Sequence, residues 1–315
     1  MSERLAVLGA GRIGRQIALA GALGGRQAVL IDVKDRPAGA ASALDDAFRE
    51  IERDLALMVD EGLLTDGEAA ATRRRLGRGR ALDDVRGCAF VQEALPEVIA
   101  VKRDAFKRLS EVVDAEAIVA STSSTISPND LAEAVARPER FLVAHWLNPA
   151  HVIPLVEVVP SHRTDEAVVA RTIALLASLG KVPVRCRPSP GFIGPRLQVL
   201  LMNEAVRLVE EGVATPEDVD RAFKAGMGFR YASIGIFEFI DWGGVDVLAH
   251  ASRYLTQATG DARFAAPRSV DDKMARNELG PKTGRGFYDY AGARRQQFET
   301  DKMRALLRRV KRERA

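Results

Sequence analysis

The stretch Leu5–Asp32, which reads LAVLGAGRIGRQIALAGALGGRQAVLID, decides the fold of the first part of the chain. It begins with an apolar strand candidate, Leu5–Leu8, followed by the glycine-rich turn Gly9–Gly14 with the spacing GxGxxG. A helical segment comes next, and Gln27–Ile31 is a second strand candidate that ends at the acid Asp32. Strand, glycine turn, helix, second strand and terminal acid together predict a dinucleotide-binding unit.

Each part of this pattern has a physical role in binding a dinucleotide. Gly9 permits a tight turn, Gly11 lets the backbone approach a pyrophosphate, and Gly14 lets the helix pack closely on the strand. The helix N-terminus offers unpaired N–H groups and a positive dipole end to the phosphates. Asp32 is expected to accept hydrogen bonds from the adenine-ribose hydroxyls and to repel a 2′-phosphate, so the predicted cofactor is NAD rather than NADP.

Two basic residues close to Asp32 leave the opposite preference open. Lys34 and Arg36 follow it in the sequence, and either cation could reach a 2′-phosphate. The simpler interpretation is a pair of solvated basic side chains, and we retain NAD as the predicted cofactor.

Strands and helices alternate after this unit as far as residue 185. Residues 38–76 predict an antiparallel helical hairpin, with Thr65 or Asp66 as the cap of its second helix. Further helices are expected at 98–113 and 165–179, and a short one begins after Ser127. Further strands are expected at 88–92, 117–120, 141–144, 155–159 and 182–185. Such alternation predicts a mainly parallel, doubly wound α/β sheet with helices on both faces.

The pattern changes after about residue 187, and the rest of the chain shows helical periodicity without a convincing strand. We expect helices at 195–211, 216–225, 235–256 and 269–277, followed by a basic tail after 292. The predicted organisation is therefore a Rossmann-type NAD-binding domain over residues 1–187 and an all-α domain over residues 188–315.

Composition excludes several classes of function. The chain has 315 residues and a net charge of +3, which gives no electrostatic footprint for nucleic acid. No apolar run approaches the ~20 residues that a membrane span needs, and the N-terminus enters a strand without a charged leader. Cys88 and Cys186 form no metal-binding motif, so neither a metal site nor a disulfide framework is predicted. A cytoplasmic setting fits these features.

His145 is the best placed of the four histidines for chemistry. It follows an apolar strand, and ligands bind at the carboxyl ends of strands in open α/β sheets. Glu157 interrupts the next apolar run, where a carboxylate is costly unless it is paired. A Glu157–His145 pair would leave one imidazole nitrogen to take a proton from a substrate hydroxyl. A structural histidine, and a Glu157 bound to backbone or lysine, remain the alternatives.

The hydroxyl cluster Ser121, Ser123 and Ser124 ends another predicted strand, and one of these groups could bind the reacting oxygen. NAD accepts a hydride while a histidine removes a proton, so the implied reaction is the oxidation of an alcohol. Lys181 is a rival catalytic residue, but it precedes a strand and has no evident partner.

These residues and their spacing resemble the L-3-hydroxyacyl-CoA dehydrogenase family over nearly the whole chain. The family's hydroxyl, H-x-x-N-P and L-V-E pattern appears here as Ser124, His145 with Asn148, and Glu157. The resemblance implies that Ser124 contacts the substrate oxygen, His145 is the catalytic base and Glu157 orients it. Asn148 is a further candidate contact to the substrate.

The resemblance extends to the cofactor and to the second domain. The family's cofactor-contacting Glu and Lys match Glu97 and Lys102, five residues apart. Residues 191–193 (GFI) match the family's entry into its helical domain, and residues 284–288 (GRGFY) match its C-terminal motif. The resemblance implies a homodimer that forms through the helical domain.

Two departures concern the substrate. Pro195 replaces the family's substrate-contacting Asn, so one contact is lost or supplied elsewhere. Residues 228–232 (GFRYA) resemble the branch that includes L-gulonate 3-dehydrogenase, which acts on free hydroxy acids; Arg230 could bind a carboxylate there or form an ion pair at a domain interface. Arg73–Arg75 on the hairpin and the C-terminal motif favour an acyl-CoA.

The predicted substrate is therefore a short-chain L-3-hydroxyacyl-CoA such as 3-hydroxybutyryl-CoA. A CoA-free 3-hydroxy acid is the alternative. A non-catalytic NAD-binding structural protein is a third possibility, against which the presence of Ser124, His145 and Glu157 argues.

Overall fold

The computed structural model describes residues 4–32 and 42–314. Lys34 and Arg36, the two cations that left a preference for NADP open, lie outside the described residues. The chain divides into two compact units, Met1–Leu201 and Met202–Ala315. This division falls within helix α7 (Gly194–Glu210), a short distance beyond the change of sequence character near residue 187.

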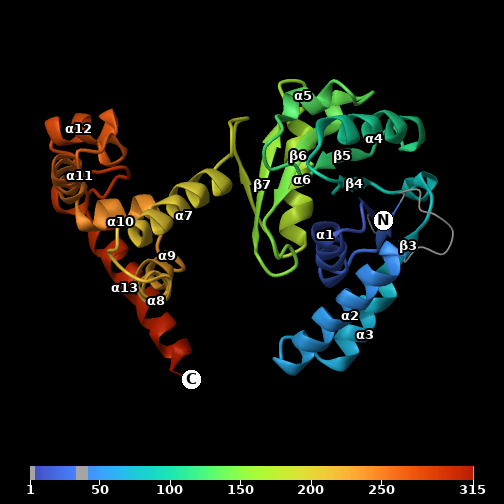
Figure 1. Cartoon of the computed structure of the whole chain (residues 1–315), viewed down its shortest axis with the longest axis horizontal. Helices are drawn as coiled ribbons and strands as arrows, with labels where there is room; N and C mark the ends of the chain where they lie inside the picture. Colours follow the sequence, from blue (N-terminus) through green and yellow to red (C-terminus); the bar gives the residue numbers. More distant parts are fainter. Residues whose placement is uncertain (1–3, 33–41, 315) are drawn as a thin grey trace. The chain divides into compact units, whose positions relative to one another are not determined.

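The first unit is built on an eight-stranded sheet with the order β3-β2-β1-β4-β5-β6-β7-β8 (Figure 1). Neighbouring strands are parallel except for the antiparallel pair β6 and β7. The predicted doubly wound sheet is therefore confirmed. The strands are β1 (Leu5–Leu8), β2 (Ala28–Ile31), β3 (Leu76–Gly79), β4 (Phe90–Glu93), β5 (Ile118–Ser121), β6 (Phe141–Trp146), β7 (Leu155–Pro160) and β8 (Val182–Arg185).

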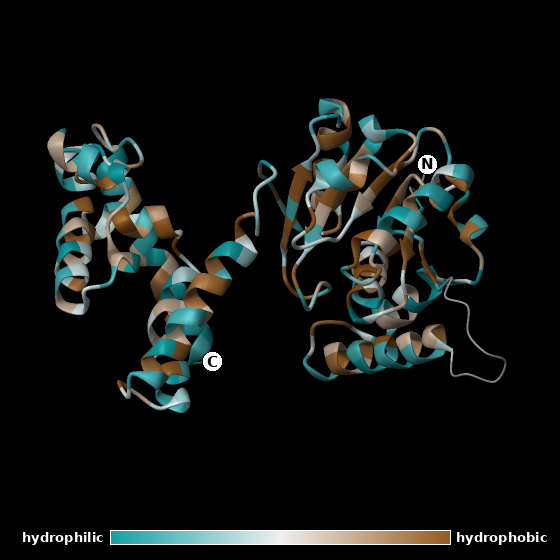
Figure 2. Cartoon of the chain, turned by 45° about the horizontal axis from the view of Figure 1, so that its top comes forward, coloured by the Kyte–Doolittle hydropathy of each residue, from teal (hydrophilic) through white to brown (hydrophobic). Residues whose placement is uncertain are grey.

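Helices cover both faces of this sheet, because alternate side chains of its buried strands point to opposite sides. Leu5 and Val7 of β1 pack with helices α1 (Arg12–Leu23) and α6 (Glu166–Ser178). Ala6 and Leu8 pack on the other face with α4 (Ile99–Val112) and α5 (Pro128–Ala132). The strands are mainly hydrophobic, as their brown colour in Figure 2 shows, so the core of this unit lies on the two faces of the sheet.

The predicted helical hairpin consists of α2 (Ala43–Asp60) and α3 (Asp66–Arg75), and packs on α1. Thr65 caps α3 in a capping box with Glu68, which satisfies two backbone donors at the helix start. The chain then enters the edge strand β3, which was not predicted. Its sequence LGRG has two glycines and no β-branched residue, so it carries no strand signal of its own.

The second unit is helical, as predicted. Its helices after α7 are α8 (Pro216–Phe223), α9 (Phe229–Tyr231), α10 (Ile236–Gly243), α11 (Val245–Thr259), α12 (Arg268–Ala275) and α13 (Arg294–Glu313). The prediction of one helix over 235–256 was wrong, because Gly244 separates α10 from α11. Gly244 has φ +104°, a conformation that strains residues with a side chain.

The basic tail expected after residue 292 is helical. Residues 294–313 form the long helix α13, since they are rich in Arg, Gln, Leu and Lys, which are good helix formers. Arg295–Glu299 and Arg309–Glu313 add ion pairs one turn apart along it. The charged residues of this segment therefore lie on a helix.

Within the described residues, short turns of 3-10 helix connect these elements at Leu82–Val85, Pro138–Arg140, Ala262–Phe264 and Pro281–Thr283. A π-helical segment, Lys224–Gly228, joins α8 to α9. Among the described residues, no helix is long and apolar enough to cross a membrane.

Candidate functional site

A cavity of about 700 Å³ lies where β4, β5 and β6 end at the carboxyl edge of the sheet. It is lined by residues that come from strand ends, from the loops after them and from the start of α7. Five of the predicted site residues are among them, namely Glu97, Lys102, Ser124, His145 and Asn148. The cavity therefore gathers residues that are up to 51 positions apart in the sequence at the edge where open α/β sheets bind ligands.

His145 and Glu157 face one another across the antiparallel pair β6–β7. They are directly opposite in the strand register, and Nδ1 of His145 lies 2.7 Å from Oε2 of Glu157. An ionised carboxylate can only accept, so the proton of a neutral imidazole belongs on Nδ1. Nε2 then carries the lone pair, and this is the nitrogen that lies 3.1 Å from Oγ of Ser124.

Glu157 is fully buried but well supplied with donors. Its Oε1 accepts 2.8 Å hydrogen bonds from the backbone N–H groups of Ile193 and Gly194 at the start of α7. Burial by itself raises the pKa of Glu157, but the hydrogen bonds from His145, Gly194 and Ile193 outweigh it and hold the pKa below its ordinary value. Glu157 therefore remains a carboxylate beside His145.

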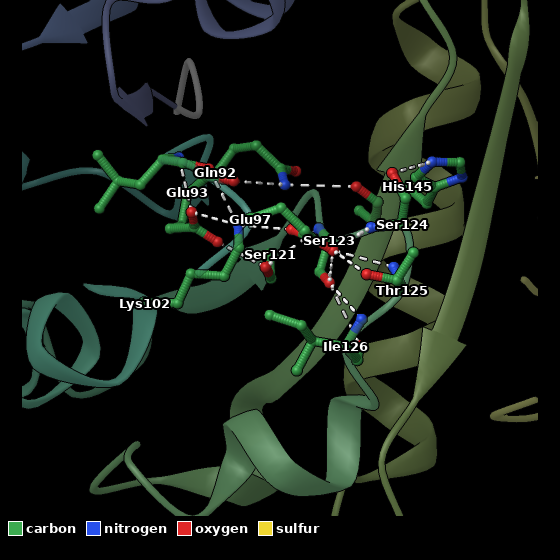
Figure 3. Close-up of polar contacts among 12 residues, drawn as sticks. Gln92, Glu93, Glu97, Lys102, Ser121, Ser123, Ser124, Thr125, Ile126 and His145 are labelled. Carbon is green, nitrogen blue, oxygen red and sulfur yellow. Dashed lines mark hydrogen bonds and ion pairs between the residues drawn. The ribbon is translucent and has the colours of Figure 1, made fainter. Parts of the chain in front are cut away.

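Only Ser124 of the hydroxyl cluster reaches His145. Ser121 instead donates to Glu93, and Ser123 donates to Oε1 of Glu97 at 2.6 Å (Figure 3). The backbone N–H of Ser124 also donates to Glu97, at 3.0 Å. Glu97 thus fixes the loop that presents the Ser124 hydroxyl to the cavity.

Glu97 is held as an anion by several donors. Burial raises its pKa, but hydrogen bonds from Ser123 and Thr125 and the charge of Lys102 outweigh this and lower the pKa to about 2. The carboxylate is therefore charged at neutral pH, where it can hold this loop.

Glu97→Gln is expected to lower the free energy of unfolding. The loss should be largest above pH 5 and should become smaller as the pH falls toward 2. A carboxylate whose pKa is lower in the folded than in the unfolded chain stabilises the fold above its unfolded pKa, and this stability is lost as the pH falls through the folded pKa. Urea unfolding of both proteins between pH 7 and pH 3 measures the difference. Glu111→Gln, at an exposed position of α4, is the control; a pH-independent loss for Glu97→Gln would contradict the expectation.

Sequence reasoning missed Glu93, the last residue of β4. Glu93 is fully buried, and its Oε1 accepts 2.7 Å and 2.6 Å hydrogen bonds from Nζ of Lys102 and the N–H of Leu95. Nζ of Lys102 lies 3.4 Å from Glu97 as well. Lys102 is itself only 1% exposed. The sequence signal was an acid at the end of an apolar strand, which is the same signal that identified Glu157.

The glycine turn has the geometry that a dinucleotide requires. A Cβ on Gly14 would lie 1.9 Å from the carbonyl oxygen of Gly9, and a Cβ on Gly9 would lie 2.6 Å from that of Ala94. A Cβ on Gly11 would meet no atom within 4 Å, so the space beside this backbone is open to a ligand. Asp32 follows β2 directly, as predicted. These residues fit the pyrophosphate and ribose of NAD.

His151, another of the four histidines, and Lys181 lie outside the cavity lining. Nε2 of His151 lies 3.8 Å from Asp54 of the hairpin. Lys181 is buried and donates to the carbonyl oxygens of Ala150 and Ile153, so it fixes the loop after His145. This structural role accounts for Lys181 without any catalytic one.

The predicted anion-binding arginines are in varied surroundings. Arg73 pairs with Glu52 within the hairpin, and Arg75 donates to the carbonyl oxygen of Ala22. Arg230 belongs to the second unit, where its guanidinium lies 4.1 Å from the ring centre of Phe239. A substrate contact by Arg230 stays a prediction.

The C-terminal motif of residues 284–288 has a structural role within the second unit. The N–H groups of Phe287 and Tyr288 donate to the buried carboxylate of Asp241, each at 2.9 Å. A Cβ at Gly286 would come within 2.3 Å of the same carboxylate. Within residues 4–32 and 42–314, no group of three or more His, Cys, Asp or Glu side chains could hold a metal ion.

Comparison with known proteins gives two family matches. The NAD-binding domain of 3-hydroxyacyl-CoA dehydrogenase matches residues 4–189, and the C-terminal domain of 3-hydroxyacyl-CoA dehydrogenase matches residues 191–290. A 3-hydroxybutyryl-CoA dehydrogenase of Bradyrhizobium diazoefficiens is 34% identical over 93% of this chain and 97% of its own.

Two further relatives span nearly the whole chain. The 5-formyl-3-hydroxy-2-methylpyridine 4-carboxylate 5-dehydrogenase of Mesorhizobium japonicum is 32% identical over 98% of this chain and 97% of its own. The crystal structure of a 3-hydroxyacyl-CoA dehydrogenase from Archaeoglobus fulgidus is similar with a TM-score of 0.76 and 32% identity, and covers 98% of this chain and 99% of that one.

Proposed function

We propose a substrate for this chain, which belongs to the 3-hydroxyacyl-CoA dehydrogenase family and is an NAD-dependent dehydrogenase. It oxidises a short-chain L-3-hydroxyacyl-CoA such as 3-hydroxybutyryl-CoA to its 3-keto product. The observation that carries this proposal is the chain of contacts from Glu157 through His145 to Ser124, which ends in the cavity. The name of the Bradyrhizobium relative supports the choice of acyl chain.

In the proposed mechanism, His145 is the general base. Its Nε2 takes the proton of the substrate hydroxyl as the carbonyl forms, and Glu157 stabilises the imidazolium that results. The Ser124 hydroxyl binds the reacting oxygen and holds it against Nε2. NAD, when bound, supplies the acceptor for the hydride from the same carbon. Gly9, Gly11, Gly14 and Asp32 of the β1–α1–β2 unit, with Glu97 and Lys102, would hold NAD.

The segments that follow the strands would position the substrate. Asn148 lines the cavity beside His145 and offers an amide to the acyl group. Pro195 has no such group, but Gln198 also lines the cavity, three residues further along α7. Residues three apart share a helix face, and we propose that Gln198 supplies the contact that Pro195 lacks.

The test is NADH formation across a panel of L-3-hydroxyacyl-CoAs of increasing chain length and the matching free 3-hydroxy acids. We expect the highest kcat/KM with a four-carbon acyl-CoA. Turnover of the free acids alone would contradict the CoA proposal and favour the second candidate. Absence of turnover with every substrate, despite NAD binding, would contradict both.

The second candidate is a CoA-free hydroxy acid. The relative from Mesorhizobium favours it, because the name of that enzyme describes a free pyridine carboxylate. Arg73 and Arg75 also favour it, because their contacts within the first unit leave them less available to CoA phosphates. Arg230 would bind the substrate carboxylate in this case.

Asp32→Ala is expected to relax the choice of cofactor. Loss of the carboxylate removes both the acceptor for the ribose hydroxyls and the repulsion of a 2′-phosphate. We expect kcat/KM for NAD to fall and the NADP-to-NAD ratio of kcat/KM to rise at least tenfold, which is about 1.4 kcal/mol. Steady-state kinetics with both cofactors measures this ratio, and an unchanged ratio would remove Asp32 from cofactor selection.

We also propose that the chain forms a homodimer through helix α7 and the second unit. Helices α7, α8 and α13 have no buried residue, and Leu200 and Leu307 are 64% and 59% exposed. Apolar surface of this extent favours a protein partner. Sedimentation equilibrium should give twice the mass of the chain, and Leu200→Asp or Leu307→Asp should shift it toward the monomer. A wild-type monomer at micromolar concentration would contradict the proposal.

A cytoplasmic location remains part of the proposal. It is supported by Cys88 and Cys186, both of which carry free thiols, because free thiols are typical of reducing compartments. Fractionation of cells that express the full chain tests it.

A further inference from the structure

Three arginines of α13 line a hollow of about 290 Å³ in the second unit. Helix α13, the red helix that ends the chain in Figure 1, follows the last residue, 290, that the family match covers. The hollow is therefore made partly by an element outside the matched family domains. Its lining residues are Ala232, Ser233, Ala305, Arg308, Arg309 and Arg312.

The sequence of α13 places the arginines together. Ala305, Arg308, Arg309 and Arg312 have the spacing i, i+3, i+4 and i+7, which puts them on one face of a helix. The small side chain of Ala305 leaves room between this face and residues 232–233, which follow α9. The hollow is thus lined by three guanidinium groups and the Ser233 hydroxyl.

The charge of this hollow is not balanced by the protein. Arg309 pairs with Glu313 at 3.0 Å. Among the described residues, neither Arg308 nor Arg312 has an ion pair or a side-chain hydrogen bond. Three cations against one carboxylate leave a net charge of +2, and Arg308 and Arg312 are like charges one turn apart, an arrangement that destabilises a helix.

Arg309 is more than a solvated surface cation. Its guanidinium lies 5.4 Å from the ring centre of Phe229, and its Nε is buried. These contacts fix the direction of the guanidinium, which reduces the entropy that a ligand would otherwise have to overcome.

The dipole at the C-terminal end of α13 explains only one of the three arginine positions. Cations in the last turn interact favourably with the helix dipole, but the effect is confined to that turn. Helix α13 ends at Glu313, so Arg312 lies in the last turn, whereas Arg308 and Arg309 precede it. A ligand of opposite charge explains all three positions.

We propose that this hollow binds a phosphate group in its dianionic form. Phosphate carries a charge of about −1.5 to −2 near neutral pH and offers three acceptor oxygens, which matches the net charge of +2 and the donors present. Guanidinium groups pair with phosphate through two parallel hydrogen bonds. A carboxylate would neutralise only half of the surplus charge.

The test is calorimetric titration of inorganic phosphate into the full chain saturated with NAD, in chloride buffer of constant ionic strength. Saturation with NAD occupies the pyrophosphate site of the first unit, and the result does not depend on turnover. We expect one phosphate per chain, and about tenfold or greater weakening in Arg308→Gln/Arg312→Gln, because two charge-assisted pairs are lost.

The matched control is Arg295→Gln/Arg304→Gln, which removes two charges from the same helix outside the hollow. It should bind phosphate as the wild type does. Absence of binding to the wild type, or equal affinity in the two double variants, would overturn the proposal. Ser233→Ala and Arg308→Lys provide a second test if the double variant does not fold, and full affinity in both would overturn it as well.

A second arm identifies the source of the phosphate. Adenosine 3′,5′-bisphosphate carries the phosphate monoester of the CoA nucleotide. Binding tighter than that of inorganic phosphate, lost in Arg308→Gln/Arg312→Gln, would assign the hollow to a CoA-type nucleotide. Binding equal to or weaker than that of phosphate, lost in the same variant, would assign it to the free ion.

Discussion

His145→Ala is expected to lower kcat by about 10³-fold or more, at the upper end of the range for loss of a general base. The dissociation constant of NAD should change by less than about twofold, because the glycine turn that fits the pyrophosphate lies between β1 and α1, whereas His145 belongs to β6. Steady-state NADH formation and calorimetric NAD binding measure the two quantities separately.

The chain offers a matched histidine control. His162 is exposed and its imidazole contacts Asn129; it does not line the cavity. His162→Ala should retain full activity. Turnover of His145→Ala within tenfold of the wild type would remove His145 from the mechanism, and a large loss of NAD affinity would show that His145 acts through the cofactor site instead.

Lys102→Met is expected to destabilise the protein by roughly 3–5 kcal/mol, the cost of removing one partner from a buried ion pair. The methionine keeps the length and apolar stem of the lysine but leaves Glu93, which is fully buried, without its cation. The loss should appear in the free energy of unfolding measured in urea at pH 7. Lys107→Met, at an exposed position on the same helix, should be nearly neutral.

A compensating variant separates charge from packing. In Glu93→Gln/Lys102→Met neither charge remains, so a substantial part of the stability lost in Lys102→Met should return. If the double variant is no more stable than the single one, the loss arises from packing around the lysine stem rather than from an unpaired carboxylate.

The doubly wound sheet was predictable because seven of its eight strands carry their own signal. The β1–α1–β2 unit combines apolar runs, glycines and a terminal acid, and each reports on backbone geometry that is local in sequence. By contrast, β3 consists of LGRG and is a strand only because β2 offers it hydrogen-bond partners. Pairing with a neighbour distant in sequence is not visible in a four-residue pattern.

The candidate site was predictable where a charged residue lies within an apolar segment of the sequence. Glu157 drew attention as an acid within an apolar strand, and the structure gives it three donors. Glu93 carries the same signal at the end of β4, but its partner Lys102 lies nine residues later on a helix. The orientation of the helix decides whether Lys102 forms its hydrogen-bonded ion pair with Glu93 or with Glu97. Composition and spacing do not encode this orientation.

Two C-terminal features show where the sequence provided less detail. The motif at residues 284–288 could be recognised, but its backbone donors surround Asp241, a residue more than 40 positions earlier in the chain. Residues after 292 were expected only as a basic tail. Met303, Leu306, Leu307 and Val310 do follow a helical spacing within α13.

The antiparallel pairing of β6 with β7 has a consequence for protein engineering. Because His145 and Glu157 occupy opposite positions of one backbone ladder, the sheet sets their separation and loop sequence does not. Asn148, Ile153 and Gln198 line the same cavity from segments outside that ladder. A combinatorial library at these three positions can therefore explore new substrates while the proton-transfer geometry is inherited unchanged.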